Sequence, residues 1–467
     1  MHELEQDKKW GIIIAIMLSL LFAALNQSIV SMALPQIMAD IGQREDISWI
    51  FTSYILAASI PALLVGKLSD LYGRKPFIML GLSLFITGSL LAGVAESFFE
   101  LVVFRAIQGL GGGAIIVTAF STIGDLYSPR ERGRWQSILG GVFALASLLA
   151  PALGGYIVDH GHWKWVFWIS TPLGCVALIM IGMLLPSYNN DEKQRVDYLG
   201  AALLVATLLP LLLVLNKGWN SSGLLLICLI ALVAFIKVER RVPHPIVPWS
   251  LFGNNVFTLS NLIVFIMGAS IFSALMYLPL FLQGVMGISA TVSGSMMMIM
   301  TLSLVISSYY SSHRISHTGR YKGLAFTGLS LIAIGMFLFS LLHSDSSYTQ
   351  SLVYITIIGM GSGIAMPVFN LSQQNAVEHD QLGVAIAAGQ LSRQLGSMIG
   401  IAYMGALISH DMYVGLGNQL TPHVLMQASR EALNSGLTDV FFTASITLLL
   451  AMSMVFFLKE IPLRSTK

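Results

Sequence analysis

The stretch GKLSDLYGRKP, residues 66–76, lies between two long apolar segments, near residues 48–67 and 76–95. It is short, cationic and bounded by glycines, so it predicts a tight turn on the cytoplasmic side of a membrane. Because Asp70 and Arg74 are four residues apart, we expect both side chains to meet on one helical turn. Two interpretations stay open: a charged gate, or an ordinary basic loop that only fixes the topology.

The rest of the chain has the composition of a membrane protein. Of its 467 residues, 55% are hydrophobic and 10% are charged, and the mean hydropathy is +0.77. A soluble domain carries about a quarter charged residues. Apolar stretches of about 20 residues, long enough to cross a bilayer as helices, recur throughout. We therefore predict an all-α polytopic membrane protein.

Fourteen membrane spans are predicted. They lie near residues 10–33, 48–67, 76–95, 99–124, 134–158, 164–186, 197–216, 222–239, 254–282, 291–311, 322–342, 351–375, 382–410 and 438–459. With the N-terminus inside, 19 of the 25 Lys and Arg residues fall in cytoplasmic segments and 4 in outer segments, while Arg105 and Arg393 lie within spans. This asymmetry follows the positive-inside rule, so both termini are predicted to be cytoplasmic.

The spans divide into two halves. We predict an N-terminal six-helix bundle over 1–188, linkers with an inserted two-helix hairpin over 189–250, and a C-terminal six-helix bundle over 251–467. The hairpin has few polar residues, which favours a lipid-facing insertion over a role in the function. The stretch SHRISHTGRYK, residues 312–322, is a decayed counterpart of 66–76. Paired repeats around a midplane cavity are typical of secondary transporters.

The fourth span contains RAIQGLGGGAIIVTAF, residues 105–120, in which Arg105, Gln108 and several glycines share one helical face. An arginine at membrane depth costs roughly 2.5–3.5 kcal/mol, so we expect it to face a partner or a wet cavity. The glycines allow a neighbouring helix to approach closely. A purely structural role for Arg105 is the alternative.

Two other spans carry small-residue patterns. The stretch GGVFALASLLAPALGGYIVD, residues 140–159, predicts close helix packing with a bend at Pro151. The stretch GQLSRQLGSMIGIAYMG, residues 389–405, contains the second intramembrane arginine, Arg393. A Met-rich run, residues 295–300, would suit an adaptable apolar wall or contact with lipid.

Together these motifs resemble the major facilitator superfamily, and within it the fourteen-span drug:proton antiporter family of multidrug and tetracycline-type exporters. The loop 66–76 is similar to the signature loop after the second helix, and the span around Arg105 is similar to the family's fourth helix. The match is close over the N-terminal half and loose over the C-terminal half. The resemblance implies the major facilitator fold, with two six-helix bundles and a two-helix insertion that operate by alternating access.

The resemblance also implies roles for individual residues. Asp70 would pair across the cytoplasmic interface and Arg74 would hold the charge relay, while Arg105 is associated with proton transfer in the family. The segment with Ala150 looks like the antiporter motif of exporters, although the family usually has glycine at that position. The residues of that motif are Gly140, Pro151, Gly154 and Gly155. The candidates for proton coupling and gating are Asp70, Arg74, Arg105, Asp125, Asp159 and Arg393.

Position 26 departs from the pattern of many members of this branch, which carry an acid there. Asn26, in LNQSIVSMALP, can only form hydrogen bonds, as does the asparagine that tetracycline exporters have at this position. Acids lie only near the ends of spans, and Asp125 is placed to form an ion pair with the basic loops. The candidates for the substrate cavity are Asn26, Tyr54, Gln108, Asn261, Tyr277, Asn370, Gln374 and Gln390. Each of them has a hydrogen bond between helices as its alternative role.

The expected function is secondary active export of amphipathic drugs or toxic compounds, by substrate/H⁺ antiport. The alternatives are Na⁺ or K⁺ coupling, and a lipid or glycolipid flippase on the same scaffold. A nutrient importer and a non-transporting receptor fit the motifs less well. We expect no enzymatic activity, no metal or other cofactor and no nucleic-acid partner. The expected protein is a monomer in the bilayer of a bacterial cell membrane that binds a small amphipathic substrate.

Overall fold

The computed structural model describes residues 6–41, 48–127, 129–187, 198–217, 222–242, 251–377, 382–415 and 422–460. Within these ranges every regular element is a helix. Their bounds are α1 (Gln6–Ile41), α2 (Trp49–Tyr72), α3 (Arg74–Ala92), α4 (Phe98–Leu126), α5 (Pro129–His160), α6 (Trp165–Trp168), α7 (Thr171–Leu184), α8 (Tyr198–Lys217), α9 (Ser222–Glu239), η1 (Leu251–Gly253), α10 (Asn255–Met267), η2 (Gly268–Phe272), α11 (Ser273–Leu280), η3 (Phe281–Val285), α12 (Ala290–Thr318), α13 (Lys322–Ser340), α14 (Tyr348–Asn375), α15 (Leu382–Gly415) and α16 (Pro422–Phe457).

Each of the fourteen predicted spans coincides with a helix or with a run of consecutive helical segments. Among the described residues, eleven helices are long and apolar enough to cross a membrane. The run α10–η2–α11–η3 makes up the ninth span, and both η2 and η3 are π-helical turns. The prediction of an all-α, fourteen-helix membrane fold is therefore confirmed.

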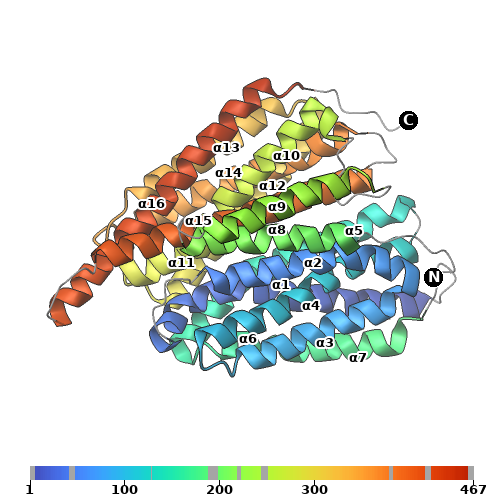
Figure 1. Cartoon of the computed structure of the whole chain (residues 1–467), viewed down its shortest axis with the longest axis horizontal. Helices are drawn as coiled ribbons and strands as arrows, with labels where there is room; N and C mark the ends of the chain where they lie inside the picture. Colours follow the sequence, from blue (N-terminus) through green and yellow to red (C-terminus); the bar gives the residue numbers. More distant parts are fainter. Residues whose placement is uncertain are drawn as a thin grey trace. The chain divides into compact units, whose positions relative to one another are not determined.

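The chain forms two compact units. Unit 1 contains residues 1–214 and 221–246, and unit 2 contains residues 215–220 and 247–467. In unit 1, α4 packs against α2 and α3, and α1 packs against α5; in unit 2, α14 packs in the same way against α12 and α13, and α10 against α15. Figure 1 shows these helices in blue to green for unit 1 and yellow to red for unit 2. The divisions predicted at residues 188 and 250 stay predictions.

The two counterpart loops turn on glycine at the same place. Gly73 is the eighth residue of GKLSDLYGRKP and has φ +86°, and Gly319 is the eighth residue of SHRISHTGRYK and has φ +67°. L-amino acids with side chains rarely adopt positive φ, so each glycine allows one helix to end in a tight turn, with the next helix beginning at Arg74 after Gly73 and at Lys322 after Gly319. The internal repeat is thus visible in the backbone as well as in the sequence.

The turn at Gly73 also corrects one expectation. Asp70 lies on α2 and Arg74 begins α3, so the two residues do not share a helical turn. The spacing of four residues predicts a contact only when the helix continues through it, and the glycine ends the helix between them. The side chain of Asp70 lies outside the part of the structure that is described.

In each unit a lysine ties the start of the third membrane span to the end of the sixth. In unit 1, Nζ of Lys75 donates to the carbonyl of Gly182 on α7, 2.7 Å away. In unit 2, Nζ of Lys322 donates to the carbonyl of Phe456 on α16, 2.9 Å away. A lysine near a helix C-terminus satisfies carbonyls that lack intrahelical partners and opposes the negative end of the helix dipole.

One predicted span is broken. Residues 164–186 were expected to form one helix, but α6 ends at Trp168 and α7 begins at Thr171. Pro172 explains the break, because its ring clashes with the carbonyl four residues earlier, that of Trp168, and it has no N–H to donate. The break leaves Ser170 between the two helices, where its side chain bonds to α1.

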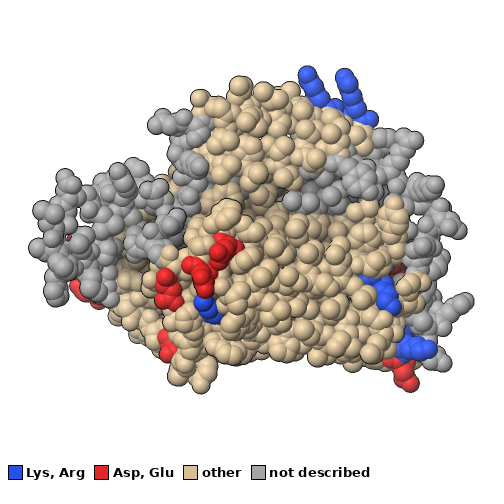
Figure 2. All heavy atoms as spheres, turned by 60° about the horizontal axis from the view of Figure 1, so that its bottom comes forward, with Lys and Arg blue, Asp and Glu red and all other residues tan. Residues whose placement is uncertain are grey.

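The inserted helices α8 and α9 separate the two bundles in the sequence. On α9, large apolar side chains are exposed: Leu226, Ile227, Leu229, Ile230, Leu232 and Val233. Exposed apolar side chains are expected where a helix faces lipid. The face of the molecule in Figure 2 is mostly uncharged, with Lys, Arg, Asp and Glu gathered in a few small groups.

Candidate functional site

Arg105 on α4 is buried in unit 1, with 1% of its surface exposed. Its Nε donates to the carbonyl of Ile50 at 3.1 Å, and its Nη1 donates to Oε1 of Gln108 at 2.5 Å. The guanidinium carbon lies 4.3 Å from the ring centre of Tyr54, a cation–π contact. Among the described residues no carboxylate pairs with it, so a carbonyl, an amide and an aromatic face hold this charge.

Gln108 extends these contacts to two other helices, α1 and α3. Its Nε2 donates to Oδ1 of Asn26 at 3.2 Å and to Oγ of Ser89 at 2.7 Å. Nδ2 of Asn26 donates in turn to the carbonyl of Phe22 at 3.2 Å and to the hydroxyl of Ser170. We call this set the Arg105 network. Its members are Asn26, Tyr54, Ser89, Arg105, Gln108 and Ser170.

Asn26 needs an amide to occupy its place in the network. It accepts a hydrogen bond from Gln108 and donates two, to Phe22 and Ser170. An ionised carboxylate is an acceptor only, so an aspartate here would face the Phe22 carbonyl without a proton between them. Of the two interpretations of Asn26 and Gln108, the geometry favours hydrogen bonding between helices.

The glycines of α4 allow this network to form. A Cβ on Gly109 would lie 2.3 Å from the Tyr54 carbonyl oxygen, and one on Gly113 would lie 2.1 Å from that of Ala58. On the neighbouring helix α3, a Cβ on Gly88 would lie 2.7 Å from the backbone nitrogen of Gln108. The close approach predicted for this glycine face is therefore present, and α4 touches α2 backbone to backbone.

Asp125 at the end of α4 forms the ion pair expected with the basic loop. Nε of Arg74 lies 2.8 Å from Oδ2 of Asp125, and Nη1 of Arg74 donates to the hydroxyl of Ser69 at 2.6 Å. The Arg74 side chain is 10% exposed and that of Asp125 is 38% exposed. The Asp125 carboxylate is thus open to solvent while it is paired with Arg74.

The small-residue helix α5 packs closely over only part of its length. A Cβ on Gly154 would lie 2.7 Å from Cγ1 of Ile29 on α1, and Pro151 and Gly155 are also buried. At Gly140, by contrast, no described atom lies within 4 Å of such a Cβ. The predicted close packing is therefore wrong at Gly140 and correct at Gly154. Asp159 is exposed near the C-terminal end of the same helix.

In unit 2, Asn261 and Tyr277 are buried and bonded within the bundle. Oδ1 of Asn261 accepts from Ser392 at 3.1 Å and from Gln373 at 3.4 Å, and its Nδ2 donates to the carbonyl of Phe257 at 2.8 Å. The Tyr277 hydroxyl donates to the carbonyl of Ile401 at 3.1 Å. As with Asn26 and Gln108, these side chains join helices to one another.

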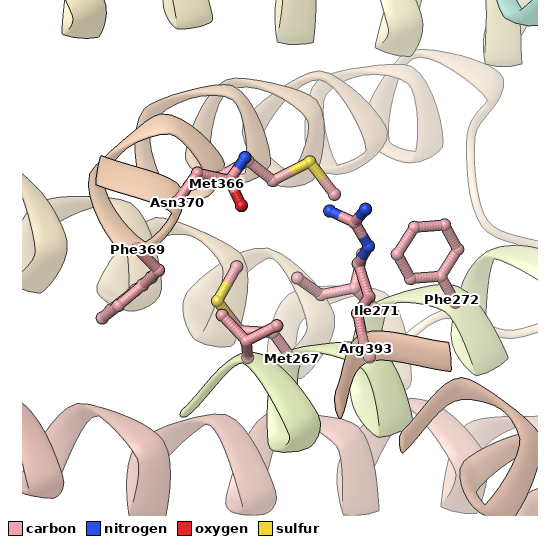
Figure 3. Close-up of a pocket in the computed structure, with 9 residues that line it drawn as sticks. Met267, Ile271, Phe272, Met366, Phe369, Asn370 and Arg393 are labelled. Carbon is pink, nitrogen blue, oxygen red and sulfur yellow. The ribbon is translucent and has the colours of Figure 1, made fainter. Parts of the chain in front are cut away.

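Arg393 on α15 lies beside a recess in unit 2 (Figure 3). The residues that line it are Val264, Met267, Gly268, Ile271, Phe272, Met366, Phe369, Asn370 and Arg393. Arg393 donates to Oε1 of Gln390, which is exposed. Of the predicted cavity and coupling residues, Asn370 and Arg393 therefore line the recess, and Gln390 is joined to it only through Arg393. Gln374, which is partly exposed, is not among the lining residues.

Several contributing residues were not identified from the sequence. Ser89 and Ser170 are hydroxyls in mostly apolar segments, and only the Gly88–Ser89 pair hints at a close helix contact. The methionines of the recess are Met267 and Met366, and not those of the run 295–300. Met296 and Met300 of that run are buried, so they do not contact lipid, and neither is among the residues that line the recess.

Comparison with known proteins agrees with this arrangement. Residues 16–401 match the family described as Major Facilitator Superfamily. The chain is 34% identical over 428 residues to the multidrug transporter protein MdtP of Bacillus subtilis, an alignment covering 90% of this chain and 79% of that protein. It is 30% identical to multidrug resistance protein 3 of Bacillus subtilis, covering 97% and 96% of the two chains.

The solved structures give the same fold. The crystal structure of a bacterial homologue of the human lysosomal transporter Spinster superimposes with a TM-score of 0.73. The superposition covers 97% of each chain at 13% sequence identity. At this identity the likeness concerns the fold alone.

Proposed function

This chain belongs to the Major Facilitator Superfamily of membrane transporters, and from that premise we propose that it exports amphipathic drug-like compounds by alternating access. The observation that carries the proposal is the extent of its similarity to proteins named for multidrug transport and resistance. That similarity reaches 30–34% identity over 90–97% of this chain. The membrane arginines and the closely packed Gly154 segment of α5 support a transporter, not an enzyme, and are consistent with export.

We propose that export is driven by proton antiport, with Asp125 as the group that exchanges the proton. Arg105, the buried cation of unit 1, has only neutral partners among the described residues. Asp125 is paired with Arg74 and is also partly exposed, so its protonation would release Arg74. The acids Asp70 and Asp159 are the other candidates, and Na⁺ or K⁺ in place of H⁺ is the alternative coupling.

The proposed setting is a bacterial cell membrane. The chain would cross it fourteen times with both termini in the cytoplasm and act as a monomer. Its exposed apolar helices support contact with lipid, as on α9. The compound carried would be small and amphipathic, and no cofactor would take part.

Purified protein in proteoliposomes with an imposed pH gradient and a lumenal pH dye tests the proposal. Lipophilic cations, tetracycline-like compounds and neutral amphiphiles are added separately. We expect at least one class to collapse the gradient in a protein-dependent way. Asp125→Asn is expected to lower this substrate-driven proton flux more than tenfold, which is the size of effect expected when one charge-assisted hydrogen bond is lost.

Asp70→Asn and Asp159→Asn are compared in the same assay. Asp345→Asn is the matched control, because Asp345 is an exposed carboxylate in the loop between α13 and α14. If none of the three candidate substitutions changes the proton flux, proton coupling through these acids is wrong. Movement of labelled lipid without solute-driven proton flux would instead identify a flippase.

A further inference from the structure

The two membrane arginines have very different surroundings. Arg105 is enclosed, and its guanidinium meets a backbone carbonyl, the Gln108 amide and the Tyr54 ring. Arg393 is only partly buried and lines a recess. Its one described hydrogen bond goes to the neutral amide of Gln390. The two arginines were both expected to serve proton coupling and gating, but of the two only Arg393 lines a recess.

The guanidinium of Arg393 retains most of its hydrogen-bonding capacity. A guanidinium has five N–H donors in a planar fork that fits a carboxylate with two parallel bonds. Figure 3 shows this group pointing into the recess, with the side chain of Met366 and the ring of Phe272 beside it. Among the described residues no carboxylate pairs with Arg393. A cation at membrane depth without a counter-charge is costly, and an incoming anion would offset that cost.

The walls of the recess suit an apolar group next to that anion. Met267, Ile271 and Phe272 come from α10 and η2, and Met366 and Phe369 come from α14. Methionine side chains adapt to ligands of different shape, and aromatic rings offer flat apolar contact. Among the described residues, Asn370 is the one other polar side chain that lines the recess, and its amide carries no charge.

The backbone fixes the guanidinium relative to these walls. The π-helical turn η2 (Gly268–Phe272) places Ile271 and Phe272 at the recess, and such turns are frequent at functional sites. A Cβ on Gly268 would lie 2.4 Å from the carbonyl oxygen of Arg393, so η2 and α15 are in backbone contact at this residue. On the other side, Pro367 lies inside α14 between Met366 and Phe369.

We propose that this recess binds the anionic end of an amphipathic substrate, with Arg393 as the anion-binding residue. The substrate class is an aromatic or alkyl carboxylate or sulfonate. This proposal rests on the proposed export function and specifies one class of compound for it. It also gives Arg393 a role in recognition in place of proton coupling.

Binding of a matched pair of probes tests the charge requirement. Radiolabelled 1-naphthoate and its uncharged amide, 1-naphthamide, are titrated onto full-length protein in a neutral detergent. We expect wild-type protein to bind naphthoate more tightly, and Arg393→Gln to weaken naphthoate binding by at least about tenfold while naphthamide binding stays within about twofold. Arg393→Lys keeps the charge but not the planar fork, so its affinity for naphthoate is expected to lie between those of wild-type protein and Arg393→Gln.

Two controls separate this effect from misfolding. Retained naphthamide binding by Arg393→Gln demonstrates a folded site. Tyr403→Phe is the matched control on the same helix, because Tyr403 is exposed and lies away from the recess-lining set; it is expected to bind both probes like wild type. Equal affinity of wild-type protein for the two probes, or an equal loss of both in Arg393→Gln, would overturn the proposal.

A reconstitution experiment separates a transported anion from an anionic lipid headgroup. Naphthoate binding and efflux are compared in phosphatidylcholine vesicles and in vesicles with added phosphatidylglycerol. Arg393-dependent efflux that is insensitive to phosphatidylglycerol supports a substrate site. Displacement of naphthoate by phosphatidylglycerol without any efflux overturns it in favour of a lipid site. Export of cationic or neutral drugs without naphthoate binding would refute this inference and leave the proposed function intact.

Discussion

Asn26 and Gln108 each use both ends of their amide groups, and this explains how an arginine can lie inside a membrane bundle without an acid. Gln108 accepts from Arg105 through its oxygen and donates to Asn26 and Ser89 through its nitrogen. The partial charges along this chain of hydrogen bonds are aligned, and such chains polarise one another in a low dielectric. An uncharged residue at position 26 is therefore part of how the Arg105 charge is held.

The Arg105 network predicts an energetic coupling between Asn26 and Gln108. Asn26→Ala and Gln108→Ala are each expected to lower the free energy of unfolding by about 1–3 kcal/mol, because each leaves buried polar atoms unpaired. The double variant should lose less than the sum, with a coupling of about 0.6 to 1.7 kcal/mol, the range found for hydrogen bonds between membrane helices. Denaturant titration in mixed micelles measures all four proteins.

The control for this comparison of single and double variants combines Asn26→Ala with Asn261→Ala. The hydrogen-bond partners of Asn261 are Phe257, Gln373 and Ser392, none of which bonds to Asn26. Sites without shared partners are additive within about 0.5 kcal/mol. Additivity of Asn26→Ala and Gln108→Ala to the same degree would mean that the network does not act as a unit.

At the scale of the element, glycine has opposite consequences on two helices of unit 1. On α4, Gly113 faces the backbone of α2, and its missing Cβ is what brings the two helices into contact. On α5, Gly140 faces a space without described atoms within 4 Å. The sequence pattern of regularly spaced small residues is similar at both places, so only packing distinguishes them.

Alanine at these two glycines is expected to have opposite effects. In Gly113→Ala the new Cβ would overlap the Ala58 carbonyl oxygen at 2.1 Å, so α2 and α4 must separate. Overpacking of this kind costs about 1–3 kcal/mol. In Gly140→Ala the open site and the better helix propensity of alanine are expected to give a gain of about 0.5–1 kcal/mol. Thermal unfolding in detergent measures both, and a similar change in the two variants would contradict this account.

The helices could be predicted from the sequence because a local property, the apolar composition of each segment, determines where they form. Long apolar segments indicated all fourteen spans, and basic residues in alternate loops indicated their orientation. The hydrogen-bond partners of the buried side chains could not be predicted, because they lie far apart along the chain. Gln108 and Asn26 are 82 residues apart, and the sequence around either amide does not specify the other. The recess was not predicted for the same reason: Met267, Met366 and Arg393, which line it, come from three different helices.

At the scale of the whole molecule, the repeat and the charge distribution describe the same topology. The positive-φ glycines Gly73 and Gly319 occupy equivalent places in two basic loops, and each loop holds a lysine bonded near the end of its unit's sixth membrane span. Both loops must lie on one side of the membrane if the two bundles are repeats of the same orientation. The excess of Lys and Arg in these segments predicts that this side is the cytoplasmic one.

This topology predicts the labelling of single cysteines in intact cells. The chain has two cysteines, Cys175 and Cys228, so Cys175→Ala with Cys228→Ala gives a cysteine-free background. Thr318→Cys places a thiol at the exposed end of α12, and Ser344→Cys places one in the exposed loop between α13 and α14. A membrane-impermeant maleimide is expected to label Ser344→Cys at once and Thr318→Cys only after the cells are permeabilised.

The two positions lie on opposite sides of α13, which crosses the membrane once, so they must give opposite results in any correct topology. The reversed pattern would put both termini outside and invalidate the assignment from charge. Labelling of both positions in intact cells would mean that α13 (Lys322–Ser340) does not span the bilayer. That result would contradict the fourteen-helix topology itself, since every later helix would change its orientation.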